Sequence, residues 1–261
     1  MTNNPLKFHW SLSQAGDNLR SSGEYKELSG LLNYQDQLNL CLKAEENGID
    51  SMLMAIGFTR PDPLVLTTAL GLDTDHIKFT VAVRSGLITP AYFVQQINTA
   101  SQLIGDRIYL NVVSGHTPSE LKYYGDFKEK EERNARTKEF VEICNAFWKH
   151  DEPVNFNGKY YQVENGTIAT PYNSEKGRPE VYIAGNSQNA VDLVSEHGDC
   201  LWRFPESPSD LAPKIIDAIT AGKEAGLITS IIARPTQEEA VQAAENLITN
   251  FVYFDISRKK I

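Results

Sequence analysis

The chain has 261 residues, a length that suits one (β/α)₈ barrel or two small domains. Apolar residues make up 41% of it and charged residues 23%, which is ordinary for a globular protein that buries a core. The net charge of −9 argues against a broad nucleic-acid-binding surface.

Short apolar runs alternate with longer amphipathic segments in the first half of the chain. The predicted strands cover residues 8–12, 51–56, 76–84 and 107–113, and the predicted helices between them cover residues 34–48, 61–72 and 89–104. Thr89 and Pro90 mark the start of the last of these helices, because threonine caps a helix and proline suits its first turn. A polar loop over residues 13–29 follows the first strand.

The second half of the chain is less regular. A charge run over residues 128–136 is interpreted as the solvated start of a helix that carries Phe140 and Phe147. Asn157 and Gly158 lie between alternating residues and predict a hairpin over residues 154–161. The other predicted elements are strands over residues 181–184, 200–202 and 230–233, a helix over residues 187–196, and a helix that runs from a capping box at residues 236–239 to Asn250.

Regular strand–helix alternation without a break in composition predicts one parallel sheet in a single domain over residues 1–261. We count seven strand–helix units, with residues 251–254 as a possible eighth strand. The same residues continue a helical stripe with Val241, Ala244 and Ile248, so this segment is either a strand or a helix. The expected fold is a (β/α)₈ TIM-barrel-like fold with an incomplete or modified last strand–helix unit.

The candidate site lies at the carboxyl ends of the predicted strands, where function gathers in parallel barrels. Residues 111–118 are small and polar, so that the backbone near Asn111 and Ser114 could approach a flat ring. The alternative is a glycine turn with a capping hydroxyl. His116 in the same run is either a general base or an ordinary loop residue.

Three other strand ends carry candidate residues. Gly185, Asn186 and Ser187 enter a helix whose free amides could bind phosphate, although capping alone would also select Asn and Ser. Arg84 ends the third strand and is either a cation that faces a ligand or the partner of a loop carboxylate. Gly57 follows the second strand. His9, inside the first strand, is interpreted as a structural residue.

Several motifs of known chemistry are missing. The sequence has no HxH or HExxH pair, no GxSxG elbow, no P-loop and no GxGxxG, which argues against metallohydrolases, serine hydrolases, kinases and Rossmann dehydrogenases. Cys41, Cys144 and Cys200 are widely spaced and odd in number, so neither a disulfide framework nor a metal site is expected. The N-terminus does not read as a signal peptide, and no stretch has the roughly 18 apolar residues of a membrane span. We therefore expect a cytoplasmic protein that binds neither nucleic acid nor membranes.

The order of six motifs is more specific than any one of them. They are AEENGIDS at residues 44–51, GFTRPDP at 57–63, VRSGL at 83–87, NVVSGHTP at 111–118, YYGDF at 123–127 and GNS at 185–187. In this order they resemble the bacterial luciferase-like flavin monooxygenases, and most of all the branch of alkanesulfonate monooxygenase and its relatives from biosynthetic clusters. The resemblance extends from about residue 8 to about residue 248.

The resemblance implies a barrel enzyme that receives reduced FMN (FMNH₂) from a separate flavin reductase and oxygenates a small organic or secondary-metabolite substrate through a C4a-peroxyflavin. It implies that Asn111 and Ser114 lie by the isoalloxazine ring, that Gly57 is close to the cofactor, and that residues 185–187 hold the phosphate. Members commonly pair through helices beside the second and third strands. We therefore expect a homodimer or a heterodimer with a longer paralogue.

The chain departs from the pattern of the resembling family in three places. Glu132-Arg133-Asn134 stands where relatives carry Glu-Arg-Tyr, so one aromatic contact is absent. The first loop and the segment around Ser230 lack the histidines and the arginine that the alkanesulfonate enzymes place there, which disfavours a sulfonate substrate. The last strand–helix unit of the family is not recognised. A non-catalytic flavin-binding protein or partner subunit is therefore the main alternative, and a flavin-free barrel lyase or isomerase is a third.

Overall fold

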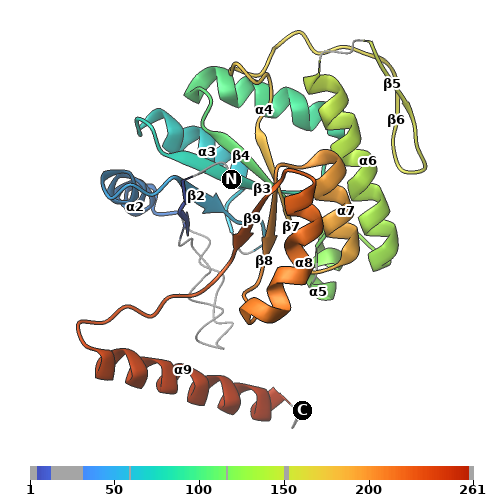
Figure 1. Cartoon of the computed structure of the whole chain (residues 1–261). Helices are drawn as coiled ribbons and strands as arrows, with labels where there is room; N and C mark the ends of the chain where they lie inside the picture. Colours follow the sequence, from blue (N-terminus) through green and yellow to red (C-terminus); the bar gives the residue numbers. More distant parts are fainter. Residues whose placement is uncertain (1–4, 13–31, 59, 116, 150–152, 259–261) are drawn as a thin grey trace.

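The computed structural model describes residues 5–12, 32–58, 60–115, 117–149 and 153–258, with side chains described as far as residue 247 (Figure 1). Its centre is a sheet of seven parallel strands, each added beside the previous one in the order β1-β2-β3-β4-β7-β8-β9. This order is that of a (β/α) barrel and confirms the expected fold class. The strands are β1 (His9–Ser11), β2 (Ser51–Met54), β3 (Lys78–Arg84), β4 (Ile108–Val113), β7 (Glu180–Ala184), β8 (Cys200–Arg203) and β9 (Glu224–Leu227).

The sheet is curled into part of a barrel. Lys7, just before β1, forms ion pairs across the concave side with Glu180 of β7 at 3.3 Å and with Glu224 of β9 at 3.1 Å. These contacts draw the two edge strands toward each other. Among the described residues this sheet has no eighth strand, and β9 and β1 are its two unpaired edges.

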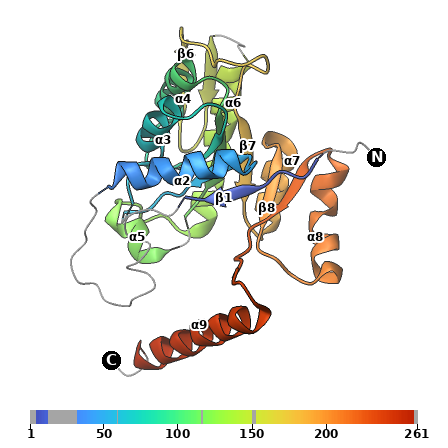
Figure 2. The same cartoon turned by 90° about the vertical axis from the view of Figure 1, so that its left-hand side faces the viewer.

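Helices cover the convex face of the sheet (Figures 1 and 2). They are α2 (Tyr34–Glu46), α3 (Pro63–Leu72), α4 (Pro90–Ile104), α6 (Lys130–Trp148), α7 (Gln188–His197) and α8 (Pro208–Thr220). All of them contribute apolar side chains to one buried cluster with the strands. The short α5 (Pro118–Tyr123) follows β4, and α9 (Gln237–Arg258) extends away from the sheet in both views.

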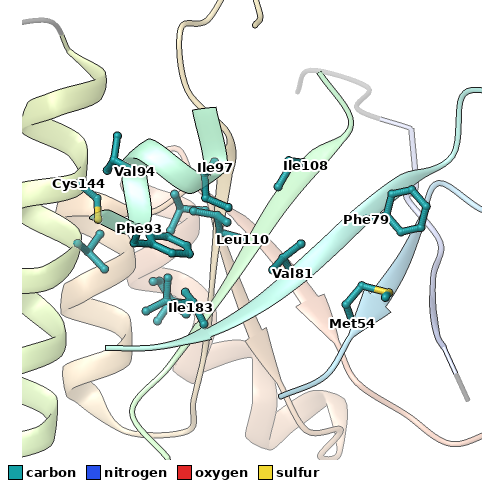
Figure 3. Packing of buried hydrophobic residues seen from close by; sticks show 14 of the residues in the cluster. Met54, Phe79, Val81, Phe93, Val94, Ile97, Ile108, Leu110, Cys144 and Ile183 are labelled. Atoms are coloured by element: carbon teal, nitrogen blue, oxygen red, sulfur yellow. The ribbon is translucent and has the colours of Figure 1, made fainter. Parts of the chain in front are cut away.

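Side-chain alternation along the strands separates a helix-packed face from a concave face. On β3, Phe79, Val81 and Val83 belong to the core cluster under the helices, while Thr80 and Arg84 lie on the opposite face. Figure 3 shows Leu110 of β4 and Ile183 of β7 near Phe93 of α4, with Phe79 of β3 farther along the sheet near Met54 of β2. The concave face is therefore free to carry polar groups.

The predicted hairpin is present, with a longer turn than expected. Strand β5 (Val154–Asn157) pairs antiparallel with β6 (Gln162–Gly166). The Glu139 carboxylate of α6 accepts hydrogen bonds from the backbone amides of residues 159–161, at 2.9, 2.8 and 3.1 Å. Because the amides of residues 159–161 bond to this carboxylate, these residues belong to the turn, and the second strand begins at residue 162.

The prediction of a strand over residues 230–233 is wrong. Residues 228–234 have no regular structure, and Ile231 is 70% exposed. The edge strand is β9 instead, whose sequence EAGL has little strand character. Gly226 fits there because a Cβ would lie 2.7 Å from Trp202 Cδ1, and Glu224 fits because it pairs with Lys7.

Two further differences concern helices. Helix α8 was not predicted from the sequence. Ser207 and Pro208 mark its start: the Ser207 hydroxyl accepts a hydrogen bond from the Asp210 amide, and Pro208 is the first helical residue. Residues 251–254, which were open between strand and helix, belong to α9. The expected start of that helix is confirmed, since Thr236 Oγ1 accepts a hydrogen bond from the Glu239 amide at 3.2 Å.

Candidate functional site

The carboxyl ends of β3, β4, β7 and β8 meet at one end of the curled sheet. Asn111 of β4 pairs in register with Ala82 of β3 and with Tyr182 of β7. The last paired residues of β4 and β7 are Val112 and Ile183. Ser114 and Gly185 each come two residues after this pair, just past the ends of these neighbouring strands. The topology therefore brings the predicted ring-binding and phosphate-binding segments side by side.

An aromatic layer fills the concave face on the amino-terminal side of this end. Tyr109, Tyr182, Cys200 and Trp202 form a second buried cluster. Their neighbour His9 contacts the Tyr182 and Trp202 rings edge-on, with centroid distances of 5.4 and 5.3 Å. This packing makes a floor of aromatic rings, and Asn111 lies two residues beyond Tyr109 on the same face.

His9 belongs to a hydrogen-bonded chain in this layer. Its Nδ1 lies 2.7 Å from Ser51 Oγ, which lies 2.7 Å from Thr80 Oγ1. Burial lowers the pKa of His9 below its ordinary value, so the ring is neutral near pH 7. These contacts account for His9 as a structural residue of the concave face, in agreement with its interpretation from the sequence.

Arg84 has a carboxylate partner. Its Nη2 lies 3.1 Å from Oε2 of Glu120 on α5, and both side chains are buried. Of the two alternatives for Arg84, the structure therefore shows the ion pair with a loop carboxylate. Arg84 Nε and Nη1 have no hydrogen-bond partner among the described residues, and the guanidinium carbon lies 5.3 Å from the centroid of the Tyr124 ring.

Glu120 also explains the position of Gly57. The other carboxylate oxygen, Oε1, accepts a hydrogen bond from the Phe58 amide at 3.2 Å, and a Cβ on Gly57 would lie 3.0 Å from it. Gly57 and Arg84 are thus joined through Glu120 at the ends of β2 and β3. Sequence reasoning did not identify Glu120. The only indication of Glu120 in the sequence was that a carboxylate follows the polar run of residues 111–118.

The loop after β4 is held by Arg133. Its Nε donates to the Ser114 carbonyl at 3.2 Å and its Nη1 donates to the Lys128 carbonyl at 2.6 Å. Gly115 has a φ of +83°, a backbone conformation that favours glycine. His116 lies outside the described residues, so its role as a general base stays a prediction.

The segment after β7 is an open helix N-terminus. The Gly185 amide donates to the Trp202 carbonyl at 3.0 Å, and a Cβ on Gly185 would lie 2.8 Å from Ala190 Cβ. Ser187 is the N-cap of α7, its hydroxyl makes no capping hydrogen bond, and the first turn carries no acidic residue. The partial positive charge of this end is therefore available to an anion.

Two features of this end fit a flavin. Asn111 Oδ1 is buried and has no hydrogen-bond partner among the described residues, so it can accept a hydrogen bond from a ring N–H group. The uncapped N-terminus of α7, which follows the neighbouring strand β7, can accept a phosphate. A buried acceptor beside an anion site on a floor of aromatic rings suits a flat heterocycle with a phosphate tail.

Other classes of site are absent from the described part of the chain. No group of three or more His, Cys, Asp or Glu residues there could hold a metal ion. None of its helices is long and apolar enough to span a membrane. The three cysteines are buried free thiols.

The family model of luciferase-like monooxygenases matches residues 6–260. The chain belongs to this family. Membership confirms the resemblance that the six motifs indicated, and it assigns the chain to a class of enzymes.

Solved structures of similar fold include three enzymes of different chemistry. EDTA monooxygenase from Chelativorans sp. BNC1 has a TM-score of 0.76 at 20% identity, covering 95% of this chain and 69% of that one. A riboflavin lyase, solved with modified FMN and riboflavin, has a TM-score of 0.76 at 19% identity, covering 95% and 67%. An F420-dependent secondary alcohol dehydrogenase, solved with an F420-acetone adduct, has a TM-score of 0.72 at 20% identity, covering 91% and 72%. At these identities the likeness establishes the fold.

Proposed function

We propose that this member of the luciferase-like family is an FMN-dependent monooxygenase. It takes reduced FMN from a separate flavin reductase and oxygenates a small organic or secondary-metabolite substrate. Reduced FMN, when bound, supplies the activation of dioxygen. The protein supplies the binding, the orientation and the exclusion of water.

One observation carries the proposal more than any other. The buried, unpartnered Asn111 Oδ1 lies on the strand next to the uncapped N-terminus of α7, above the aromatic layer of Tyr109 and Tyr182. Asn111 would accept a hydrogen bond from the isoalloxazine ring. Ser114 would contact the ring edge, and Gly185, Asn186 and Ser187 would hold the phosphate.

Of the other residues of the site, Arg133 and Glu120 would position these groups, whereas Arg84 and His116 are candidates to act on the substrate. Arg133 fixes the Ser114 carbonyl, and Glu120 joins the loop at Gly57 to Arg84. The unpartnered Nε and Nη1 of Arg84 make it the candidate contact for a polar substrate group on that side of the ring. His116 remains a candidate general base.

An isotope experiment tests the activity. The full chain is mixed with an NADH-dependent flavin reductase, FMN, ¹⁸O₂ and a panel of small ketones, thioethers and amines, and the products are analysed by mass spectrometry. We expect ¹⁸O in at least one product only when both the chain and FMN are present. Peroxide is measured in parallel, since an open sheet should release part of the oxygen as peroxide. Peroxide formation at the rate of the reductase alone, with no labelled product, would contradict the proposal for these substrate classes.

Two alternatives are tested by a binding titration of the chain with FMN and with F420, run beside the isotope experiment. Flavin binding without labelled product favours a non-catalytic flavin-binding protein or a partner subunit of a longer paralogue. The similar F420-dependent dehydrogenase raises a deazaflavin cofactor as the other alternative. Binding of F420 in preference to FMN would favour it.

A further inference from the structure

A buried arginine, Arg203, lies beside the open N-terminus of α7. Arg203 ends β8 and its side chain is 3% exposed. Its Nη2 lies 3.5 Å from the Asn186 carbonyl oxygen, at the limit of a hydrogen bond. The guanidinium therefore lies directly beside the segment of Gly185 to Ser187.

The positive charge of Arg203 is poorly compensated. Its carboxylate partner is Glu206, whose Oε1 also lies at 3.5 Å, and the other oxygen of Glu206 pairs with the half-exposed Lys214. Arg203 Nε is buried and has no hydrogen-bond partner in the described ranges of the chain. A buried guanidinium with an unused N–H group and a shared carboxylate is costly unless an anion joins it.

We propose that Arg203 binds the phosphate of FMN together with the N-terminus of α7, and that it makes the chain select FMN over riboflavin. This inference rests on the proposed flavin function. The guanidinium supplies charge-assisted N–H donors to the phosphate oxygens, and the uncapped amides of α7 supply the rest. When the phosphate binds, Arg203 would exchange its contact with the Glu206 carboxylate for a contact with the phosphate.

The proposal is tested by calorimetric titration of the full chain with photoreduced FMN and photoreduced riboflavin under anaerobic conditions. In Arg203→Met we expect FMN affinity to fall about tenfold or more, while riboflavin affinity stays unchanged. Arg203→Lys should recover part of the loss, because it keeps the charge. Lys176→Gln is the matched control. It removes one positive charge near Asp199, away from α7's N-terminus, and should leave both affinities unchanged.

A second variant covers the possibility that Arg203→Met does not fold. Glu206→Gln changes a partly exposed side chain and removes the carboxylate that competes with phosphate. It should bind FMN several-fold more tightly and riboflavin as before. Equal effects of Arg203→Met on both flavins, or FMN binding unchanged in both variants, would overturn the assignment.

Failure of the flavin function is distinguishable from failure of this inference. If the native chain binds neither flavin, the proposed function fails, and inorganic phosphate alone becomes the probe. Phosphate binding by the native chain that Arg203→Met abolishes would still support an anion site at Arg203. No phosphate binding by the native chain would overturn it.

Discussion

Buried polar side chains at the end of the sheet fall into two groups. Arg84 and Glu120 satisfy each other's charge, and Glu120 also accepts an amide hydrogen bond. Asn111 Oδ1 has no partner among the described residues. A buried carboxylate with a paired charge, such as Glu120, stabilises the fold, whereas an unsatisfied buried acceptor weakens it unless a ligand completes it. Substitution of Glu120 should therefore lower the free energy of unfolding, whereas substitution of Asn111 should lower the affinity for FMN and leave the free energy of unfolding unchanged or higher.

Asn111→Leu should separate binding from stability. The substitution removes an acceptor that no described protein group uses, so the urea midpoint of unfolding should stay the same or rise. Affinity for reduced FMN should fall about tenfold, the value of one lost hydrogen bond in a buried site. Calorimetry and urea unfolding measure the two effects. A lowered midpoint with unchanged flavin affinity would show that Asn111 has a structural role instead.

Glu120→Gln should destabilise the fold, because it leaves the buried Arg84 without a counter-charge. The loss expected for breaking a buried ion pair is about 3 kcal/mol of unfolding free energy. Glu46→Gln is the control, since Glu46 pairs with Lys43 on the surface of α2 and its side chain is 68% exposed. That variant should change stability by well under 1 kcal/mol. Equal urea midpoints for the two variants would contradict the role of Glu120.

Among the elements, most of those with strong local signals were predicted well, but α8 was not identified despite Ser207 and Pro208 at its start. Thr89-Pro90 opens α4 as expected, and apolar runs predicted β1, β2, β3, β4, β7 and β8 to within a few residues. The errors lie where tertiary contacts outweigh local preference. Strand β9 forms from EAGL because Gly226 leaves room for the Trp202 ring and Glu224 forms an ion pair with Lys7. These two contacts join residues far apart in the chain, so the sequence alone does not reveal them.

The site was predictable in part for the same reason. Strand-end reasoning and the family motifs located Asn111 and residues 185–187, because parallel strands end at one edge of a sheet. Arg203 is the last residue of β8, so the rule that site residues lie at the carboxyl ends of parallel strands would also have selected it as a candidate. Glu120 could not be found in this way, because its partner Arg84 is 36 positions away in the chain.

The junction between β7 and β8 depends on one carboxylate. Asp199 accepts hydrogen bonds from Arg178 Nη1 and Nη2, both at 2.7 Å, and from the Val181 amide at 2.8 Å. Burial alone would raise the pKa of Asp199, but these donors outweigh it and lower the pKa from 3.8 to about 2. The stabilisation is thus fully present above about pH 4 and is lost as the pH falls toward 2.

Asp199→Asn should remove that pH dependence. Near pH 7 the variant should lose roughly 2 kcal/mol of unfolding free energy. The difference between native chain and variant should narrow as the pH falls below about 4. Urea midpoints at pH 7, 5, 4 and 3 measure it. A difference that stays constant over this range would contradict the assignment.

At the scale of the whole molecule, the sheet is open and several helices expose apolar side chains. Those on α3 and α4 include Val65, Leu72 and Leu103, which are 71%, 61% and 56% exposed. These helices follow β2 and β3, the place where the sequence resemblance put a pairing surface. Clustered exposed apolar side chains favour association.

We predict that the chain forms a dimer through α3 and α4. The double variant Leu72→Glu and Leu103→Glu should be monomeric by sedimentation velocity at micromolar concentration. Ile219→Glu on α8, where the native side chain is 46% exposed, is the control and should remain a dimer. A native chain that sediments as a monomer would contradict the prediction. Loss of the dimer in the control alone would place the surface on α8.

We propose that the end of the curled sheet between β4 and α7 binds reduced FMN. The most direct measurement is an anaerobic calorimetric titration of the full chain with photoreduced FMN, followed by the same titration of Asn111→Leu. We expect saturable binding of one FMN per chain and a lower affinity in Asn111→Leu. Absence of saturable binding, or binding that Asn111→Leu leaves unchanged, would contradict it.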